Sequence, residues 1–167
     1  MADIIDLIVE DHQWFRQRFF NLDAARSEAE LRAVWEPLAL RLETHADAEE
    51  TIFYPALLKR GDSGDPKDET EDAIHDHNEI RDAIRAARAE EVGTPKWFEA
   101  VGEARKQNGQ HMDEEEREVL PDFLKSTTGE LRHDLAMQWL QFFYEHPQGR
   151  GVPDEDKDPK AYIEDNA

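Results

Sequence analysis

Cysteine is absent from the 167 residues of this chain. Disulfide bonds, thiolate metal sites and thiol catalysis are therefore excluded, and any metal must be held by histidine and carboxylate side chains. Long apolar runs are also missing, since the longest, over residues 4–9, is interrupted by Asp6 and is too short to span a membrane. Acidic residues flank this run where a secretory signal would be basic, so we expect a cytoplasmic protein.

Positive charge is scarce as well. The chain has 20 Lys and Arg against 40 Asp and Glu, which gives a formal net charge of -20. Such a surface repels phosphate groups, so we expect no nucleic-acid partner and no anionic membrane. Hydrophobic residues still make up 38% of the chain, which is enough for one folded domain whose helices have strongly solvated outer faces.

The pattern of apolar residues predicts an all-α protein. They recur at spacings of three and four, and no segment alternates between apolar and polar residues as a strand does. Pro37 and Pro55 should kink or break the second helix, and the Gly- and Asp-rich residues 61–66 should form a loop. Ser27 and Thr94 are expected to cap helix starts. The expected helices cover approximately residues 3–22, 27–59, 67–91, 94–124 and 129–145.

One local motif occurs twice. Each of the pairs His45/Glu49 and His111/Glu115 is followed directly by a second Glu and, six residues after the first Glu, by a proline. Residues four apart lie on one face of a helix, so each pair can present a nitrogen and a carboxylate to one point. Apolar stripes turn both pairs toward the core, where a carboxylate needs an ionic partner or a metal. The duplication therefore favours metal ligands over surface pairs.

The first and third helices each offer one inward histidine. His12 continues the apolar stripe of the first helix, and Phe15 follows one turn later. His77 lies on the apolar stripe of the third helix, whereas His75 lies about 160° away around the helix. A single inward histidine is usually an ordinary core residue, but four helices that each contribute one favour a shared metal site.

Together these residues resemble the ligand set of the hemerythrin-like His-His-Glu cation-binding family. The resemblance covers residues 1–125 and implies that they form an up-down four-helix bundle around two oxo- or hydroxo-bridged iron ions. Residues 126–167 would add a C-terminal helix, packed outside the bundle, and an extended acidic tail to which we assign no chemistry. The ligands that the resemblance implies are His12, His45, Glu49, His77, His111 and Glu115.

The sequence departs from the oxygen-carrying hemerythrins at one ligand. Those proteins use a fifth histidine four residues from the third-helix histidine, where this chain has Ala73 and Arg81. Each iron would then keep roughly one open position. Tyr54 is the candidate ligand or shield for the gap, with an ordinary packing role as the alternative. Regular helical geometry places Tyr54 about 140° from Glu49, but Pro55 removes a helical hydrogen bond and can re-aim it.

Several other titratable residues are expected to lie outside the ligand set. Glu50 and Glu116 point about 100° away from the preceding Glu, toward an outer layer or solvent. His133 and His146 are expected at the surface. A ferritin-like di-iron bundle is disfavoured because it needs two Glu-x-x-His motifs, and the chain has one, at residues 130–133.

The predicted function follows from the open positions. A di-iron pair of this kind binds dioxygen, peroxide or nitric oxide, so we expect a protein that binds and reduces such oxidants in oxidative or nitrosative stress. Catalase- or peroxidase-like activity and consumption of nitric oxide are the enzymatic forms of this hypothesis. The alternative is a non-catalytic oxygen or iron sensor or carrier whose metal state a partner protein reads. A helical interaction protein with zinc or no metal is a third reading.

Overall fold

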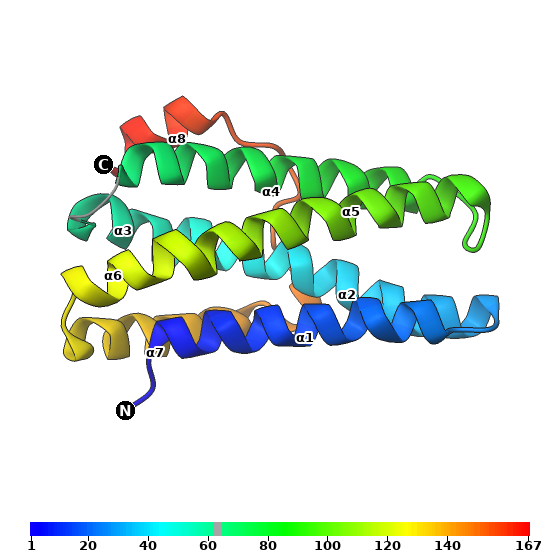
Figure 1. Ribbon diagram of the computed structural model, residues 1–167, viewed down its shortest axis with the longest axis horizontal. Helices are drawn as coiled ribbons and strands as arrows, with labels where there is room; N and C mark the ends of the chain where they lie inside the picture. The colour runs from blue at the N-terminus through cyan, green and yellow to red at the C-terminus, as the bar shows by residue number, and fades with distance from the viewer. Residues whose placement is uncertain (62–64) are drawn as a thin grey trace.

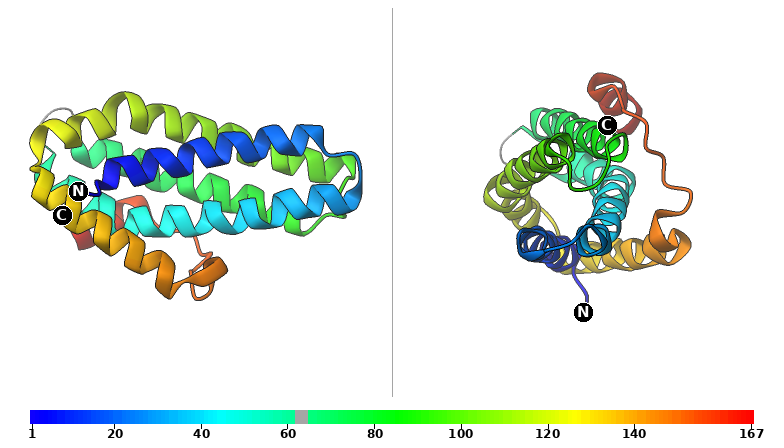
Figure 2. Two further views of the ribbon diagram at one scale, coloured as in Figure 1. Left: turned by 90° about the horizontal axis from the view of Figure 1, so that it is seen from below. Right: turned by 90° about the vertical axis from the view of Figure 1, so that its right-hand side faces the viewer.

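The computed structural model describes residues 1–61 and 65–167 as a bundle of helices, and no strand occurs among these residues. The prediction of an all-α bundle is therefore confirmed. Residues 62–64 of the predicted loop lie outside the described residues. None of the described helices is long and apolar enough to cross a membrane. The long helices, which run up and down along the bundle (Figures 1 and 2), are α1 (Ile4–Ala24), α2 (Glu28–Ala48), α4 (Pro66–Arg88) and α5 (Pro95–Glu114).

Side-chain caps fix two helix starts that the sequence predicted. The Ser27 hydroxyl accepts a hydrogen bond from the Glu30 backbone N–H at 3.2 Å, and the Thr94 hydroxyl accepts one from Trp97 at 3.4 Å. These bonds satisfy amide groups that have no partner inside the first turn. Pro37 is exposed and does not interrupt α2, so a break at this position is not found.

Each copy of the repeated motif widens into a π-helical turn that begins at its first Glu. The turns are η1 (Glu49–Phe53), which leads into α3 (Tyr54–Arg60), and η2 (Glu115–Val119), which leads into α6 (Leu120–Ser126). The backbone N–H of Tyr54 bonds to the carbonyl of Glu49, and that of Leu120 bonds to the carbonyl of Glu115, five residues back. A proline follows each donor and has no N–H, so regular α-helical bonding cannot continue through it. The predicted interruption at Pro55 is thus a change of helix type.

The apolar core has two parts, and the motif residues lie between them. On α1, Ile8 belongs to one part and Phe15 to the other, with the buried His12 between them. The same order holds on α4, where His77 separates the two parts. A layer of polar side chains therefore crosses the middle of the bundle, with close-packed apolar residues on either side.

The predicted C-terminal helix, α7 (Gly129–Glu145), packs against α1, α2 and η1 (Figure 2). It lies outside the four long helices, but one of its side chains contacts a histidine of the polar layer. The Trp139 side chain is 2% exposed, and its ring lies 5.3 Å from the ring of His45. This helix therefore forms part of the wall around the layer.

The last residues of the chain form a helix where the sequence analysis expected an extended tail. After η3 (Pro147–Gly149) the chain runs without regular structure until α8 (Pro159–Asn166), which packs on α4 and α3. Asp158 caps this helix by accepting a hydrogen bond from the Ala161 N–H at 2.8 Å. The Asp158-Pro159 pair is a helix-start signal, and the acidic composition of the tail concealed it.

Trp139→Ala tests whether α7 is an integral part of the fold. We expect this variant to lose about 3–5 kcal/mol of unfolding free energy in urea titrations, because a large buried ring is removed. Met137 lies on the same helix with 50% of its surface exposed. Met137→Ala should therefore change the stability by less than about 0.5 kcal/mol. Equal stabilities of the two variants would contradict a docked α7.

Candidate metal centre

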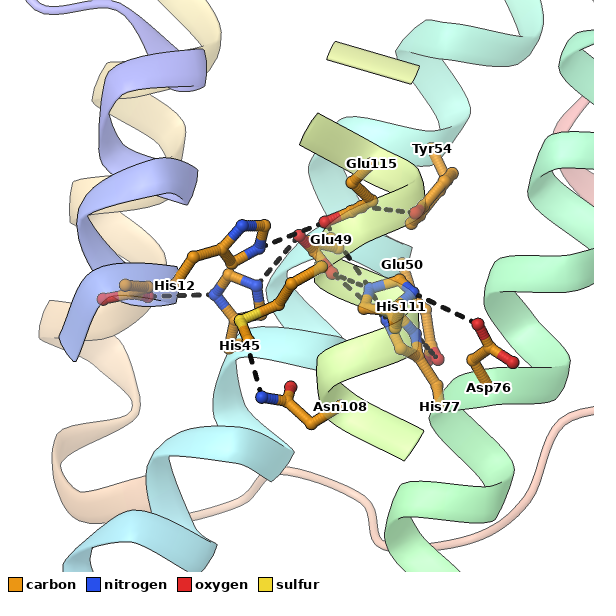
Figure 3. A network of polar contacts seen from close by, with 12 residues as sticks. His12, His45, Glu49, Glu50, Tyr54, Asp76, His77, Asn108, His111 and Glu115 are labelled. Atoms are coloured by element: carbon orange, nitrogen blue, oxygen red, sulfur yellow. Dashed lines mark hydrogen bonds and ion pairs between the residues drawn. The ribbon is translucent and has the colours of Figure 1, made fainter. Parts of the chain in front are cut away.

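The six predicted ligand side chains meet inside the bundle (Figure 3). We call this set the His/Glu cluster, and none of its members is more than 3% exposed. The histidines come one from each long helix, and the two carboxylates come from the first residues of η1 and η2. The members are His12 of α1, His45 of α2, Glu49 of η1, His77 of α4, His111 of α5 and Glu115 of η2.

The cluster divides into two groups of atoms that each fit one cation. In both groups one ligand atom from every residue lies within 4.8 Å of the others. The first group contains His12, His45, Glu49 and Glu115, and the second contains Glu49, His77 and His111.

Glu49 belongs to both groups because its two oxygens face different histidines. Its Oε1 lies 2.9 Å from His45 Nε2, and its Oε2 lies 3.1 Å from His77 Nε2 and 3.4 Å from His111 Nε2. Glu115 also lies between the groups, with Oε2 at 3.1 Å from His12 Nε2 and 3.5 Å from His111 Nε2. Glu49 thus belongs to both groups, and Glu115 approaches one histidine of each.

The ligand atoms of the first group are buried and close to one another. Among residues 1–61 and 65–167, no hydrogen-bond partner is found for His12 Nε2, His45 Nε2, Glu49 Oε1 or Glu115 Oε2. In the second group, the Nε2 atoms of His77 and His111 lie only 3.0 Å apart. Buried polar atoms are nearly always satisfied, so this convergence of nitrogen and carboxylate lone pairs fits bound metal cations.

A ring of outer carboxylates turns the imidazoles toward the centre. The Nδ1 atom of His12 lies 2.9 Å from Glu116, that of His45 lies 3.0 Å from Asp11, and that of His77 lies 2.8 Å from Glu50. The Nδ1 atom of His111 faces Asp76 at 3.7 Å. A carboxylate at Nδ1 keeps the proton there and leaves the Nε2 lone pair for a metal. The outer carboxylates are Asp11, Glu50, Asp76 and Glu116.

The sequence analysis placed two of these acids, Glu50 and Glu116, outside the ligand set and did not identify Asp11 and Asp76. Each outer carboxylate is a sequence neighbour of a cluster residue on its own helix, but it contacts a histidine of another helix. A signal was present, because the dipeptide Asp-His occurs at residues 11–12 and again at 76–77.

Charges within the cluster strongly shift the pKa values of its members. Burial opposes charge on Glu49, yet His45 and hydrogen bonds from the neighbouring histidines hold the pKa of Glu49 well below its usual value. Burial also opposes charge on His45, but Glu49 and Asp11 raise the pKa of His45 to about 9. The pKa of His111 is raised well above its usual value, because Glu115, Asp76 and Glu49 outweigh the effect of burial. The carboxylates therefore stabilise positive charge on His45 and His111, and a bound cation would take the place of these protons.

Tyr54 lies at the edge of the cluster and is fully buried. Its hydroxyl donates a hydrogen bond to Glu115 Oε1 at 2.5 Å (Figure 3). The π turn accounts for this orientation, since the residue five positions after Glu49 returns to the same face in a π-helical turn. Burial and the charges of Glu115 and Glu49 raise the pKa of Tyr54 well above its usual value, so the hydroxyl stays protonated.

The remaining sequence-predicted positions lie away from the cluster. His75 is exposed, whereas His133 and His146 are half-buried and approach the backbone carbonyls of Ala2 and Arg150. The prediction of simple surface positions for His133 and His146 was therefore only partly right.

Asp11→Asn tests the contribution of the outer carboxylates to metal binding. We expect the affinity for Co²⁺, measured by competition with a chelator, to fall about 10- to 100-fold because His45 loses the charge that orients its ring. Glu10→Gln removes the same charge at the adjacent, exposed position and should leave the affinity unchanged. Equal affinities of the two variants would contradict the role of Asp11.

Comparison with known proteins assigns the fold and site to a family. Residues 3–123 match the model of the hemerythrin HHE cation-binding domain, which is most of the chain and includes every member of the cluster. No curated protein and no solved structure matches the chain. The family match and the buried cluster together indicate a metal-binding protein, and the chain belongs to the hemerythrin HHE cation-binding family.

Proposed function

We propose that this protein holds two iron ions in the His/Glu cluster and consumes small oxidants there, with hydrogen peroxide as the leading substrate and dioxygen or nitric oxide as related ligands. The observation that carries the proposal is the division of the cluster into two ligand groups that share Glu49. In this assignment His12, His45 and Glu115 would hold one ion, His77 and His111 would hold the other, and Glu49 would serve both.

Iron is proposed because the chain belongs to the hemerythrin HHE family. Imidazole and carboxylate ligands also suit manganese, cobalt and zinc, so the donor set by itself does not select iron. When bound, a pair of iron ions would supply electrons to an oxidant and take them back. The protein supplies a closed site in which the imidazoles and carboxylates are already oriented.

The space beside the cluster supports a very small substrate. A cavity of about 50 Å³ is lined by Tyr54, His111 and Glu115, among other residues. This volume is enough for a water-sized molecule but not for an organic substrate. Its remaining lining includes Glu69, Asp72, Glu114 and Glu118. Such an acidic lining disfavours anions and leaves neutral hydrogen peroxide, dioxygen and nitric oxide as suitable ligands.

Peroxide is favoured as substrate because its consumption needs no external reductant. In disproportionation, one molecule of peroxide takes two electrons and two protons and becomes two molecules of water. A second molecule gives up two electrons and two protons and becomes dioxygen. Tyr54 is suited to assist, because its protonated hydroxyl lines the cavity and holds Glu115 by a hydrogen bond. We therefore assign Tyr54 a proton-holding and positioning role.

The first test is the metal content and spectrum of the iron-loaded protein. We expect about two irons per chain and the charge-transfer bands of an oxo-bridged ferric pair, together with consumption of added peroxide. His45→Ala and His111→Ala should each abolish the bands and the peroxide consumption, because each removes a ligand atom from one group. His75→Ala removes an exposed histidine and should leave both unchanged. Colourless protein with zinc or no metal would overturn the proposal.

Tyr54→Phe tests the proposed role of the hydroxyl. The variant should still bind iron, because the ligand atoms remain, but it should consume peroxide about 10- to 100-fold more slowly. The matched control is Tyr144→Phe, which removes a hydroxyl from a side chain that is 85% exposed. Unchanged peroxide consumption by Tyr54→Phe would show that Tyr54 only packs.

A further inference from the structure

The C-terminal segment reaches the outer layer of the site. It lies beyond residues 3–123, which match the family model, and it passes along α4 before α8 begins (Figure 1). Asn78 of α4 clamps its backbone, because the Asn78 amide donates to the Lys157 carbonyl at 2.8 Å and its oxygen accepts from the Lys157 N–H at 3.0 Å. Arg85 holds the segment at a second point by donating to Asp156 at 2.6 Å. These contacts fix the backbone position of Lys157.

The Lys157 ammonium group points into the bundle. It donates to Glu50 Oε2 and, at 3.1 Å, to Asp47 Oδ1. Both acids are buried, and Tyr162 of α8 adds a hydrogen bond to the Glu50 backbone carbonyl at 2.5 Å. The C-terminal segment thus contacts Glu50 through two residues, one at its side chain and one at its backbone.

Glu50 connects this contact to the His/Glu cluster. Its Oε1 lies 2.8 Å from His77 Nδ1, and both of its oxygens accept hydrogen bonds from the buried Arg81, at 2.9 and 2.8 Å. Each carboxylate oxygen of Glu50 therefore accepts from Arg81 and from one further donor, His77 at Oε1 and Lys157 at Oε2. A continuous path of charge-assisted hydrogen bonds leads from Lys157 through Glu50 to His77.

We propose that Lys157 is a positioning residue of the metal centre: by holding Glu50 it fixes the His77 ring and sets how strongly Glu50 draws on the His77 proton. The inference rests on the proposed function, since it assumes that His77 holds a metal. Asp11 and Glu116 receive comparable support from Arg41 and Arg16, which belong to the bundle helices. Glu50 is held by Arg81 of α4 and also by Lys157, which lies outside the residues that match the family model.

Removal of Lys157 should shift the oxidation state of a bound metal in a defined direction. Glu50 would lose one of its two cations, so more of its negative charge would be left uncompensated near the ion that His77 would hold. Extra negative charge near an ion stabilises the higher oxidation state. The ratio of ferric to ferrous iron in iron-loaded Lys157→Met, measured at one fixed solution potential, should therefore be about threefold higher than in the wild type. This effect is smaller than that of changing a group that touches a ligand.

A second readout uses zinc-loaded protein, so that it does not depend on iron chemistry. The Nδ1–H proton of His77 should exchange with water about tenfold faster in Lys157→Met, because the Glu50 carboxylate loses one of its anchors and turns away from the ring more often; tenfold is the scale of one lost anchoring hydrogen bond to a charged group. The Nδ1–H of His45, which Asp11 holds, is the internal reference and should exchange at the wild-type rate. Both rates are measured by NMR of histidine-labelled protein.

Two variants serve as matched controls. Lys160→Met removes the same charge from an exposed lysine of α8 and should behave as wild type in both measurements. Lys157→Arg keeps the charge and should restore most of the wild-type exchange rate. If Lys157→Met unfolds, the pair Lys157→Met and Asp47→Asn removes the buried carboxylate that would be left unpaired, and the fast exchange at His77 should persist.

The outcomes separate the two proposals. Zinc-loaded Lys157→Met whose His77 proton exchanges no faster than in Lys160→Met would overturn the role of Lys157, whatever the iron spectrum shows. Wild-type protein without an oxo-bridged ferric spectrum would overturn the di-iron function, and the zinc measurement would still decide whether the C-terminal segment positions His77.

Discussion

The structure depends on the compensation of charge in one buried layer. Two carboxylates and four imidazoles cross the middle of a helical bundle and divide its apolar core into two parts. In a medium of low polarizability, a carboxylate without a partner costs several kcal/mol. Every layer outward from Glu49 and Glu115 can be understood as a response to this cost, with imidazoles first, then outer carboxylates, then arginine and lysine.

The alternation of charge explains why outer carboxylates of this site pair with particular arginine and lysine side chains. An imidazole that faces a cation carries more positive character, which an acid at its other nitrogen stabilises. That acid is itself half-buried or buried and needs a cation in turn. Asp11 therefore pairs with Arg41, Glu116 with Arg16, and Glu50 with both Arg81 and Lys157. In a chain with a net charge of -20, these cations are scarce, and several of them are committed to the site.

The sequence was sufficient for features that depend on local periodicity. The three- and four-residue spacing predicted the helices, and the position of His77 on an apolar stripe correctly distinguished it from the exposed His75. Contacts between helices were harder, because spacing along one helix does not determine the rotation of its neighbour. Asp11 precedes His12 in sequence but holds His45, and this pairing exists only after α1 and α2 pack. Tyr54 was ambiguous for a related reason, since a π turn changes the facing of all later residues.

The sequence analysis expected an extended tail at the C-terminus because it judged this segment by its average composition. Most of the segment is exposed and acidic, which is typical of a tail without structure. Its contacts with Glu50 are carried by only two side chains, Lys157 and Tyr162. One lysine among many acids has little effect on composition, yet it reaches two buried carboxylates that have few other cations within reach. A short segment can therefore complete a charge network that begins in another part of the chain, and its significance depends on where its few cations lie.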